Sequence, residues 1–395
     1  MKYDLCIIGG AGHVGLPFGV VAATKGIKTA LFDLNKNSLE KISRGEFPFT
    51  EEGGEKELKL ALKKKKLFVS DSPRVIKQSD MVLLVIGTPV DEYLSPDVSQ
   101  IMKAIGAYLP YFKNGQILIL RSTVYPGTSE RIQKFLLKNR KKVDVVFCPE
   151  RIVQGKAVKE LKDLPQIVSG FNEKAVSKAE KFFKKITSRK IVNLKPIEAE
   201  LAKLFCNAWR YIQFAAANQF FMIAKDHNLD YRAIYKGMKE DYSRMKDLPS
   251  PGFAAGPCLL KDTMQLSAFH NNRFFLGHSA LLINEGLPNY VVNKLKEMGG
   301  LEDKTVGILG MAFKSEIDDI RDSLSYKLKK VAHLESKNVL CHDPYVKDAS
   351  LSPLDTVLTE SDIVILATPH AAYKKIKPEK YPDKKFIDIW HFWGN

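Results

Sequence analysis

The sequence predicts an α/β protein in which a central helical domain joins two parallel-sheet domains. Three observations lead to this fold class. Short apolar runs alternate with polar, helix-length segments in the first half of the 395 residues, the same alternation restarts at Lys304, and strand signals are missing between about Pro196 and Met298. We therefore expect domains at residues 1–195, 196–298 and 299–395.

Nine apolar runs have the length of buried parallel strands. The first domain contains the runs 5–8, 29–32, 81–86, 117–120 and 143–147, and the third contains 305–310, 338–342, 362–367 and 385–389. Residues 79–84 (SDMVLL) and 361–366 (SDIVIL) are similar in sequence. This weak repeat fits two domains of similar build.

The central segment carries the pattern of a long helix. Pro196 is placed to open it, and Glu198 and Glu200 complement the dipole of its first turn. Apolar residues then follow the 3.6-residue helical period, at Leu201, Leu204, Phe205, Ala208, Trp209, Ile212 and Ala216. This spacing predicts one long buried helix.

The charge balance indicates an anionic partner. The chain has 61 basic and 45 acidic side chains, a surplus of +16. No RNA-binding aromatic motif, zinc knuckle or helix-turn-helix signal accompanies this charge, so we expect no nucleic acid. We expect the basic run at 63–66 to be a solvated helix end. Because no leader and no apolar run of about 18 residues is found, we expect a cytoplasmic protein without a membrane partner.

The five cysteines are Cys6, Cys148, Cys206, Cys258 and Cys341. They are far apart and form no C-x-x-C pair, so the sequence predicts neither a disulfide framework nor a metal site. Cys6, Cys148 and Cys341 lie in or beside strand-like runs and are expected to be buried hydrophobes.

A glycine-rich turn follows the first predicted strand. Residues 10–15 read Gly-Ala-Gly-His-Val-Gly and precede a helical segment, which is the context of a Rossmann-like dinucleotide site. Gly10 permits the tight turn, Gly12 lets the backbone approach a pyrophosphate, and Gly15 allows close packing of helix and strand. Asp33, about 20 residues on, suits a ribose diol and repels a 2′-phosphate, so NAD is favoured over NADP.

Two further loops end strands at the carboxyl edge of the predicted sheet, where such sheets bind ligands. They are Gly87-Thr88-Pro89 and Arg121-Ser122-Thr123. The expected NAD-binding residues are therefore Gly10, Gly12, His13, Val14, Gly15, Asp33, Thr88 and Thr123.

Six motifs stand in order along the chain, at residues 10–17, 122–128 (STVYPGT), 149–155 (PERIVQG), 200–210, 251–262 (PGFAAGPCLLKD) and 310–323 (GMAFKSEIDDIRDS). In this order they resemble the UDP-glucose/GDP-mannose dehydrogenase family over almost the whole chain. The resemblance implies NAD-dependent oxidation of the C6 alcohol of a nucleotide sugar to a uronic acid, for surface polysaccharide or glycan precursors. It also implies a homodimer formed through the central helix.

The resemblance implies that Cys258 is the nucleophile. Two hydride transfers turn an alcohol into an acid, and a thiolate can hold the intermediate aldehyde as a thiohemiacetal that is oxidised to a thioester. The family's other catalytic residues correspond to Lys203, Asn207, Asp262, Glu150 and Thr123. Its substrate-binding residues correspond to Glu150, Arg151, Lys203, Asn207, Arg244, Phe253, Lys314 and Arg321, of which Arg244 is expected to reach a neighbouring subunit.

Other interpretations of these residues remain open. Glu200, Lys203 and Arg210 have the pattern of a solvated helix face. Lys314 and Arg321 have Asp318 and Asp319 nearby as simple ion-pair partners.

The chain departs from the family's pattern at two places. The turn at 253–258 is one residue shorter than usual and contains alanines, which leaves the sugar's identity open. Asn218-Gln219 stands where an Asn-Glu pair is common. UDP-glucose is slightly favoured over UDP-N-acetylhexosamines, and GDP-mannose is less favoured.

Two alternative functions remain. One is a single-oxidation dehydrogenase of the hydroxyacid type, which needs no covalent catalysis and no role for Cys258. The other is a basic nucleic-acid-binding scaffold that uses NAD as a sensor, which only the +16 charge supports.

Overall fold

The computed structural model describes residues 2–88, 90–91, 96–254 and 256–394. Pro89 and Ala255, which belong to two of the motifs above, lie outside these residues. The chain divides into two compact units, residues 1–206 and 207–395, and each is described by itself.

The first unit is built on an eight-stranded sheet. Its order is β3-β2-β1-β4-β5-β6-β7-β8, and neighbouring strands are parallel except β6 and β7. The strands are β1 (Tyr3–Ile8), β2 (Thr29–Phe32), β3 (Leu67–Ser70), β4 (Ser79–Leu84), β5 (Ile117–Leu120), β6 (Asp144–Phe147), β7 (Gln166–Gly170) and β8 (Ile191–Asn193). The order reverses between β1 and β4, and at such a point parallel sheets open a ligand crevice at the carboxyl ends of the strands.

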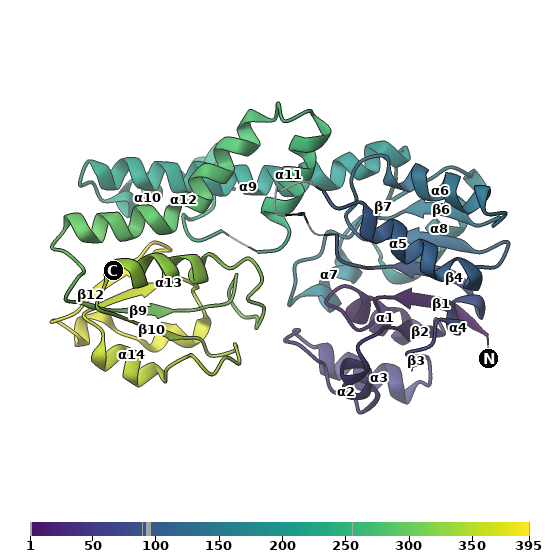
Figure 1. Ribbon diagram of the computed structural model, residues 1–395, viewed down its shortest axis with the longest axis horizontal. Coiled ribbons are helices and arrows are strands. Elements are labelled where there is room, and N and C mark those ends of the chain that lie inside the picture. The colour runs from purple at the N-terminus through teal and green to yellow at the C-terminus, as the bar shows by residue number, and fades with distance from the viewer. Residues whose placement is uncertain (1, 89, 92–95, 255, 395) are drawn as a thin grey trace. The chain divides into compact units, whose positions relative to one another are not determined.

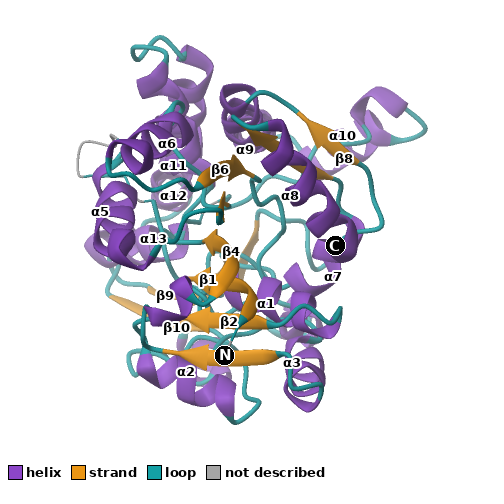
Figure 2. Ribbon diagram, turned by 90° about the vertical axis from the view of Figure 1, so that its right-hand side faces the viewer, coloured by secondary structure: helices purple, strands orange, loops and turns teal. Residues whose placement is uncertain are grey.

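Both faces of this sheet are buried because successive side chains point to opposite sides. Leu5 and Ile7 face one core with α1 (Gly15–Thr24), α2 (Lys36–Ser43), α3 (Gly54–Lys63), α7 (Ala157–Asp163) and α8 (Glu173–Ile186). Cys6 and Ile8 face the other with α4 (Arg74–Lys77), α5 (Ser99–Tyr108) and α6 (Thr128–Lys138). Figure 2 shows α5 and α6 on one side of the strands and α1, α3, α7 and α8 on the other.

The second unit contains a four-stranded parallel sheet in the order β10-β9-β11-β12. Its strands are β9 (Thr305–Leu309), β10 (Asn338–His342), β11 (Ile363–Leu366) and β12 (Lys385–Asp388). The helix α13 (Leu324–Glu335) covers one face, and α14 (Leu354–Glu360) covers the other (Figure 1).

Among the described residues between 196 and 298, the regular elements are helices and none is a strand. They are α9 (Pro196–Asp226), α10 (Tyr231–Lys239), α11 (Leu259–Phe269) and α12 (Phe275–Glu297). Helix α12 packs against α11 and α13. Single turns of 3₁₀ helix occur at Leu109–Tyr111, Ser243–Met245, Ala371–Lys375 and Pro378–Lys380.

The predicted fold class is confirmed, and each of the nine predicted strands is present. Cys6, Cys148 and Cys341 are buried as predicted, and burial raises the pKa of each thiol, to about 12 for Cys148 and about 11 for Cys341. The run 63–66 follows the end of α3, as predicted. Among the described residues, no helix is long and apolar enough to cross a membrane.

Two predictions about elements were incomplete. The strands β3, β7 and β8 were not predicted; β3 and β8 are only partly buried, and β7 is antiparallel to β6. The helix predicted as buried is α9, which buries Leu204 and Ala208 but leaves Phe205 and Trp209 54% and 60% exposed. The apolar residues of α9 occupy more than one face of the helix, so they cannot all reach one core.

Candidate active site

The glycine turn after β1 has the geometry of a dinucleotide-binding loop. A Cβ on Gly15 would lie 2.2 Å from the carbonyl oxygen of Gly9, and a Cβ on Gly10 would lie 2.8 Å from the Cα of Leu31. Beside Gly12, in contrast, the nearest atom lies at the ordinary contact distance of 3.6 Å. Gly10 and Gly15 are therefore required by packing, while Gly12 leaves backbone open to a pyrophosphate, so this loop fits NAD.

Asp33 lies directly after β2. One carboxylate oxygen accepts a hydrogen bond from the Ala11 N–H at 3.0 Å, and the other accepts one from the Asn35 N–H at 3.0 Å. The side chain is only half-buried. It therefore ties the glycine turn to the sheet and still keeps part of its carboxylate accessible to a ribose.

His13 and Val14 lie at the start of α1. The His13 ring packs on Phe49, with ring centroids 4.0 Å apart, and its Nδ1 accepts a hydrogen bond from Gln154 Nε2 at 3.2 Å. Val14 occupies the N-cap position of α1. His13 thus braces the loop against the segment that follows Glu150.

The loops after β4 and β5 are joined by side chains. The Thr88 hydroxyl donates to the Thr123 carbonyl oxygen at 2.6 Å. Ser122 Oγ accepts from the Ile86 N–H and donates to the Ile86 carbonyl oxygen, both at 2.8 Å. The structure therefore brings Thr88 and Thr123 together at the carboxyl edge.

Glu150 is held by a buried arginine that the sequence analysis did not single out. Arg121 pairs with Oε2 through Nε, at 2.6 Å, and through a terminal nitrogen, while Oε1 accepts from the Arg151 and Ile152 N–H groups. The Arg121 guanidinium also lies over the rings of Phe18 and Phe183. A carboxylate offers about four lone-pair positions, and all four are filled here.

Arg151 does not face Glu150 with its guanidinium. That group instead donates to the carbonyl oxygen of Pro165, directly before β7. Its backbone N–H is what supports the Glu150 carboxylate.

Glu200 is 1% exposed, so it is not part of a solvated helix face. Its carboxylate accepts hydrogen bonds from the Gly127 N–H at 2.6 Å, the Ser129 N–H at 2.9 Å and the Ser129 hydroxyl, which together cap α6. Burial raises the pKa of Glu200, although these hydrogen bonds oppose the shift. The cap fixes the first turns of α9, one turn before Lys203.

Lys203 is also buried, at 9% exposure, which corrects the solvated interpretation for this residue as well. Its ammonium has no hydrogen bond or ion pair within the part of the chain that the structure describes. Arg210, in contrast, is exposed. Lys203 and Asn207 lie one turn apart on the same face of α9.

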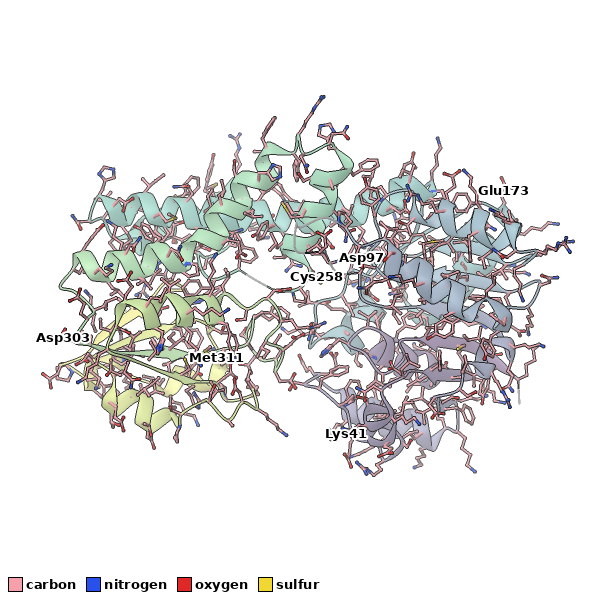
Figure 3. The ribbon with its side chains drawn as sticks, in the orientation of Figure 1. Lys41, Asp97, Glu173, Cys258, Asp303 and Met311 are labelled. Atoms are coloured by element: carbon pink, nitrogen blue, oxygen red, sulfur yellow. The ribbon has the colours of Figure 1, made fainter. Side chains whose placement is uncertain are left out.

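Asn207, Asp262 and Cys258 form a group in the second unit. Asn207 Nδ2 donates to Asp262 Oδ2 at 2.6 Å, and Lys261 Nζ lies 2.7 Å from Asp262 Oδ1. Cys258 occupies the N-cap of α11, one turn before Asp262, and its side chain is exposed (Figure 3). An exposed thiol at the positive end of a helix is suited to react as a thiolate.

Asn218, the asparagine of the Asn218-Gln219 pair, holds the turn before Cys258. Asn218 is buried; it accepts from the Gly252 N–H at 2.8 Å and donates to the Gly252 carbonyl oxygen at 3.1 Å. Gly252 packs on the Trp390 ring, which leaves no room for a Cβ. Phe253 lies in the core of the second unit.

The loop between β9 and α13 carries Lys314 and Arg321. Lys314 is half-buried, and Arg321 forms an ion pair with Asp319, as the ion-pair interpretation of Arg321 predicted. The hydrogen bond to Asp319 raises the pKa of Arg321. Arg244 lies in the Ser243–Met245 turn and is exposed.

Asp343 is a buried carboxylate directly after β10, and the sequence analysis did not single it out. Its Oδ2 accepts from the Met311 and Ala312 N–H groups and pairs with His370 Nε2, while Oδ1 accepts from the Tyr345 and Val346 N–H groups. Burial alone would raise its pKa, but the hydrogen bonds from His370 and the amides lower it overall. The sequence did contain a signal for Asp343, because this residue directly follows the second strand of its series, as Asp33 does.

Comparison with known proteins identifies the family over most of the chain. Residues 3–187 match the NAD binding domain of the UDP-glucose/GDP-mannose dehydrogenase family, residues 197–285 its central domain and residues 307–395 its UDP binding domain. A UDP-N-acetyl-D-mannosamine dehydrogenase of Methanococcus maripaludis is 30% identical over 391 residues, which cover 95% of this chain and 89% of that protein.

Two solved structures share the fold. The UDP-D-ManNAc dehydrogenase from Pyrococcus horikoshii is 27% identical, with a TM-score of 0.88 over 97% of this chain and 93% of that one. The UDP-glucose dehydrogenase from Pyrobaculum islandicum has a TM-score of 0.89 over 98% of both chains, at 24% identity. With its glycine turn and its three matched domains, the chain belongs to the UDP-glucose/GDP-mannose dehydrogenase family and is an NAD-dependent nucleotide-sugar dehydrogenase.

Proposed function

We propose that this chain oxidises the C6 alcohol of a UDP-N-acetylhexosamine to the uronic acid in two steps, through a covalent bond to Cys258. The observation that carries the proposal is the exposed Cys258 at the N-terminus of α11, one turn from a buried Asp262 bonded to Asn207. The name of the Methanococcus maripaludis relative supports UDP-N-acetyl-D-mannosamine as the first substrate to test, ahead of UDP-glucose.

In this mechanism, the glycine turn and Asp33 would hold NAD⁺, which would supply the hydride acceptor, one NAD⁺ for each of the two oxidations. The first oxidation removes a hydride from C6 and a proton from its hydroxyl, which gives the aldehyde. The Cys258 thiolate then adds to the aldehyde carbon, and the oxygen takes a proton, which gives the thiohemiacetal. Loss of a second hydride and the hydroxyl proton gives the thioester. Water attacks the thioester, the carbon–sulfur bond breaks, and the acid and thiolate are released.

The remaining residues would stabilise charge and place water. The Lys203 ammonium suits the alkoxide and the tetrahedral oxyanions, because a buried cation acts strongly on charge that develops beside it. Asn207 holds Asp262, and Asp262 would position the water. Glu150 can act as the base for hydrolysis only if Arg121 or a backbone N–H gives up its bond to the carboxylate and so frees a lone pair. We therefore assign Glu150 first to holding the backbone of residues 151 and 152.

A stoichiometric assay of Cys258→Ser tests the covalent step. Wild type should form two NADH per sugar, while the variant should lose turnover by roughly 10³-fold or more. Cys206→Ser is the matched control, since Cys206 is also exposed but belongs to α9. A Cys258→Ser variant that keeps its activity and forms one NADH per substrate would support the single-oxidation alternative instead.

The substrate is tested with a panel of nucleotide sugars. NADH formation would be compared for UDP-N-acetylmannosamine, UDP-N-acetylglucosamine, UDP-N-acetylgalactosamine, UDP-glucose and GDP-mannose. We expect the highest kcat/KM with a UDP-N-acetylhexosamine. A higher value for UDP-glucose would overturn the choice of sugar, and no activity on any of the five would overturn the proposal.

We also propose that the protein is a homodimer formed through α9. Phe205, Trp209, Phe220 and Ile223 are exposed apolar residues of this helix, and an apolar face of this kind marks an interaction surface. Sedimentation velocity should give the mass of a dimer for wild type and of a monomer for Trp209→Glu. A monomeric wild type would contradict this assignment and would leave the exposed Arg244 without the neighbouring site expected for it.

A further inference from the structure

The loop from Gly310 to Ser323 connects two parts of the nucleotide-sugar machinery. It carries Lys314 and Arg321, and it supports the turn that leads to Cys258. The Gly256 N–H donates to the Asp322 carbonyl oxygen at 3.2 Å, and a Cβ on Gly256 would lie 2.5 Å from the Phe313 ring. A shift of this loop would therefore move both Arg321 and the support of the Cys258 turn.

The loop contains neither helix nor strand, so contacts from neighbouring segments must fix its shape. At its start, the Gly310 N–H donates to the His342 carbonyl oxygen at 2.8 Å, and the Thr368 hydroxyl donates to the Ala312 carbonyl oxygen at 2.7 Å. The Met311 and Ala312 N–H groups donate to Asp343. These contacts attach the start of the loop to the ends of β10 and β11.

Further along the loop, Glu316 is attached by both its backbone and its side chain. Its N–H donates to His370 Nδ1 at 3.0 Å. Its carboxylate accepts from the Ala371 N–H at 2.6 Å and from the Tyr345 hydroxyl at 2.8 Å. The residue has a φ of +61°, an unfavourable conformation for a side chain with a Cβ, which persists only where the surroundings enforce it.

His370 links these two attachments. It is fully buried, and because Nδ1 accepts the Glu316 N–H, its ring proton is assigned to Nε2, which lies 3.1 Å from Asp343 Oδ2. Asp343 therefore holds the start of the loop and also selects the His370 tautomer that can hold Glu316.

We propose that Glu316 and His370 are positioning residues for nucleotide-sugar binding. Together they form a latch, defined as the hydrogen bonds that join Glu316 to His370, Ala371 and Tyr345, which keeps Arg321 and the Cys258 turn in place. The inference rests on the proposed function, since it assigns Lys314 and Arg321 to the UDP-sugar. It predicts that opening the latch weakens binding of the UDP-sugar and leaves binding of NAD unchanged.

The first test compares Glu316→Ala with Glu316→Gln. The alanine variant removes both side-chain contacts, so the Kd for free UDP and the KM for the UDP-sugar should each rise roughly tenfold. Glutamine keeps an acceptor for the Ala371 N–H and should stay within about threefold of wild type. Glu360→Ala, at the exposed end of α14, is the control. The Kd for NAD, measured in the same samples by calorimetry, should not change.

The second test separates the two nitrogens of His370. In His370→Asn the amide oxygen can replace Nδ1 and accept the Glu316 N–H, whereas in His370→Gln the amide nitrogen can replace Nε2 and serve only Asp343. The latch requires that His370→Asn retain UDP affinity better than His370→Gln. The opposite order would overturn the proposal, because the histidine would then act only through Asp343.

The outcomes separate this inference from the proposed function. Wild type that binds no UDP and oxidises no UDP-sugar would overturn the proposed function. Wild type that binds UDP, with Glu316→Ala binding it equally well, would overturn only the latch. Loss of folding in Glu316→Ala, seen by circular dichroism, would also overturn it, because the contacts would then serve stability and not loop position.

Discussion

Asp33 and Asp343 occupy the same place in two sheets. Each follows the second strand of its series, accepts a hydrogen bond from the loop after the first strand, and accepts another from the N–H two residues further on. They differ in what surrounds them. Asp33 remains half-buried, while the Asp343 side chain is fully buried and is covered by His370.

The difference arises in the loops after β4 and β11, the strands that pair with β1 and β9. The loop after β4 directs Thr88 to Thr123, and no described residue of this loop bonds to Asp33. The loop after β11 instead contains Thr368 and His370, and His370 Nε2 is hydrogen-bonded to Asp343 Oδ2. The same acid is thus left partly accessible in one sheet and is a buried structural anchor in the other, so its position in a motif does not by itself decide its role.

The largest expected effect separates the two acids by stability. Asp343→Asn puts an amide nitrogen among N–H donors in a buried site, so we expect a loss of about 3 kcal/mol in the free energy of unfolding. Asp33→Asn should cost less than about 1 kcal/mol, because that side chain is half-exposed. Urea unfolding followed by circular dichroism would measure both, and equal losses would break the comparison.

A smaller effect separates them by coenzyme use. Asp33→Ser removes the carboxylate that suits the ribose diol, so the KM for NAD should rise roughly tenfold and the preference over NADP should shrink. Steady-state kinetics with each coenzyme would show this. Asp383→Ser, at an exposed position of the second unit, is the control. An unchanged KM for NAD would mean that Asp33, like Asp343, only anchors its loop.

The smallest effect concerns acid. Because the folded-state pKa of Asp343 is lowered from its ordinary value of 3.8, its contribution to stability is complete above that value and is lost as the pH falls through the folded-state pKa. The stability difference between wild type and Asp343→Asn should therefore narrow by about 1 kcal/mol between pH 5 and pH 3. Unfolding curves at both pH values would measure it, and a constant difference would contradict the shift.

The sequence predicted most of the fold because buried parallel strands are continuous apolar runs, as in β1 and β9. It did not predict β7, which is antiparallel to β6, or β8, whose side chains are largely exposed. For the site, the glycine turn and Asp33 could be predicted because they lie within about 25 residues of one another in a known motif. The contacts of Arg121 with Glu150 and of Glu200 with α6 join residues 29 and 71 positions apart, and no local pattern encodes them.

The distribution of buried and exposed thiols allows selective chemical labelling of the enzyme. Three cysteines are buried with raised pKa values, and only Cys206 and Cys258 are exposed. Substitution of Cys206 by serine should therefore leave one thiol that a maleimide dye can reach in the folded protein. Labelling of that variant would count the subunits, and protection of Cys258 from the dye by a UDP-sugar would support the proposed place of this thiol at the sugar site.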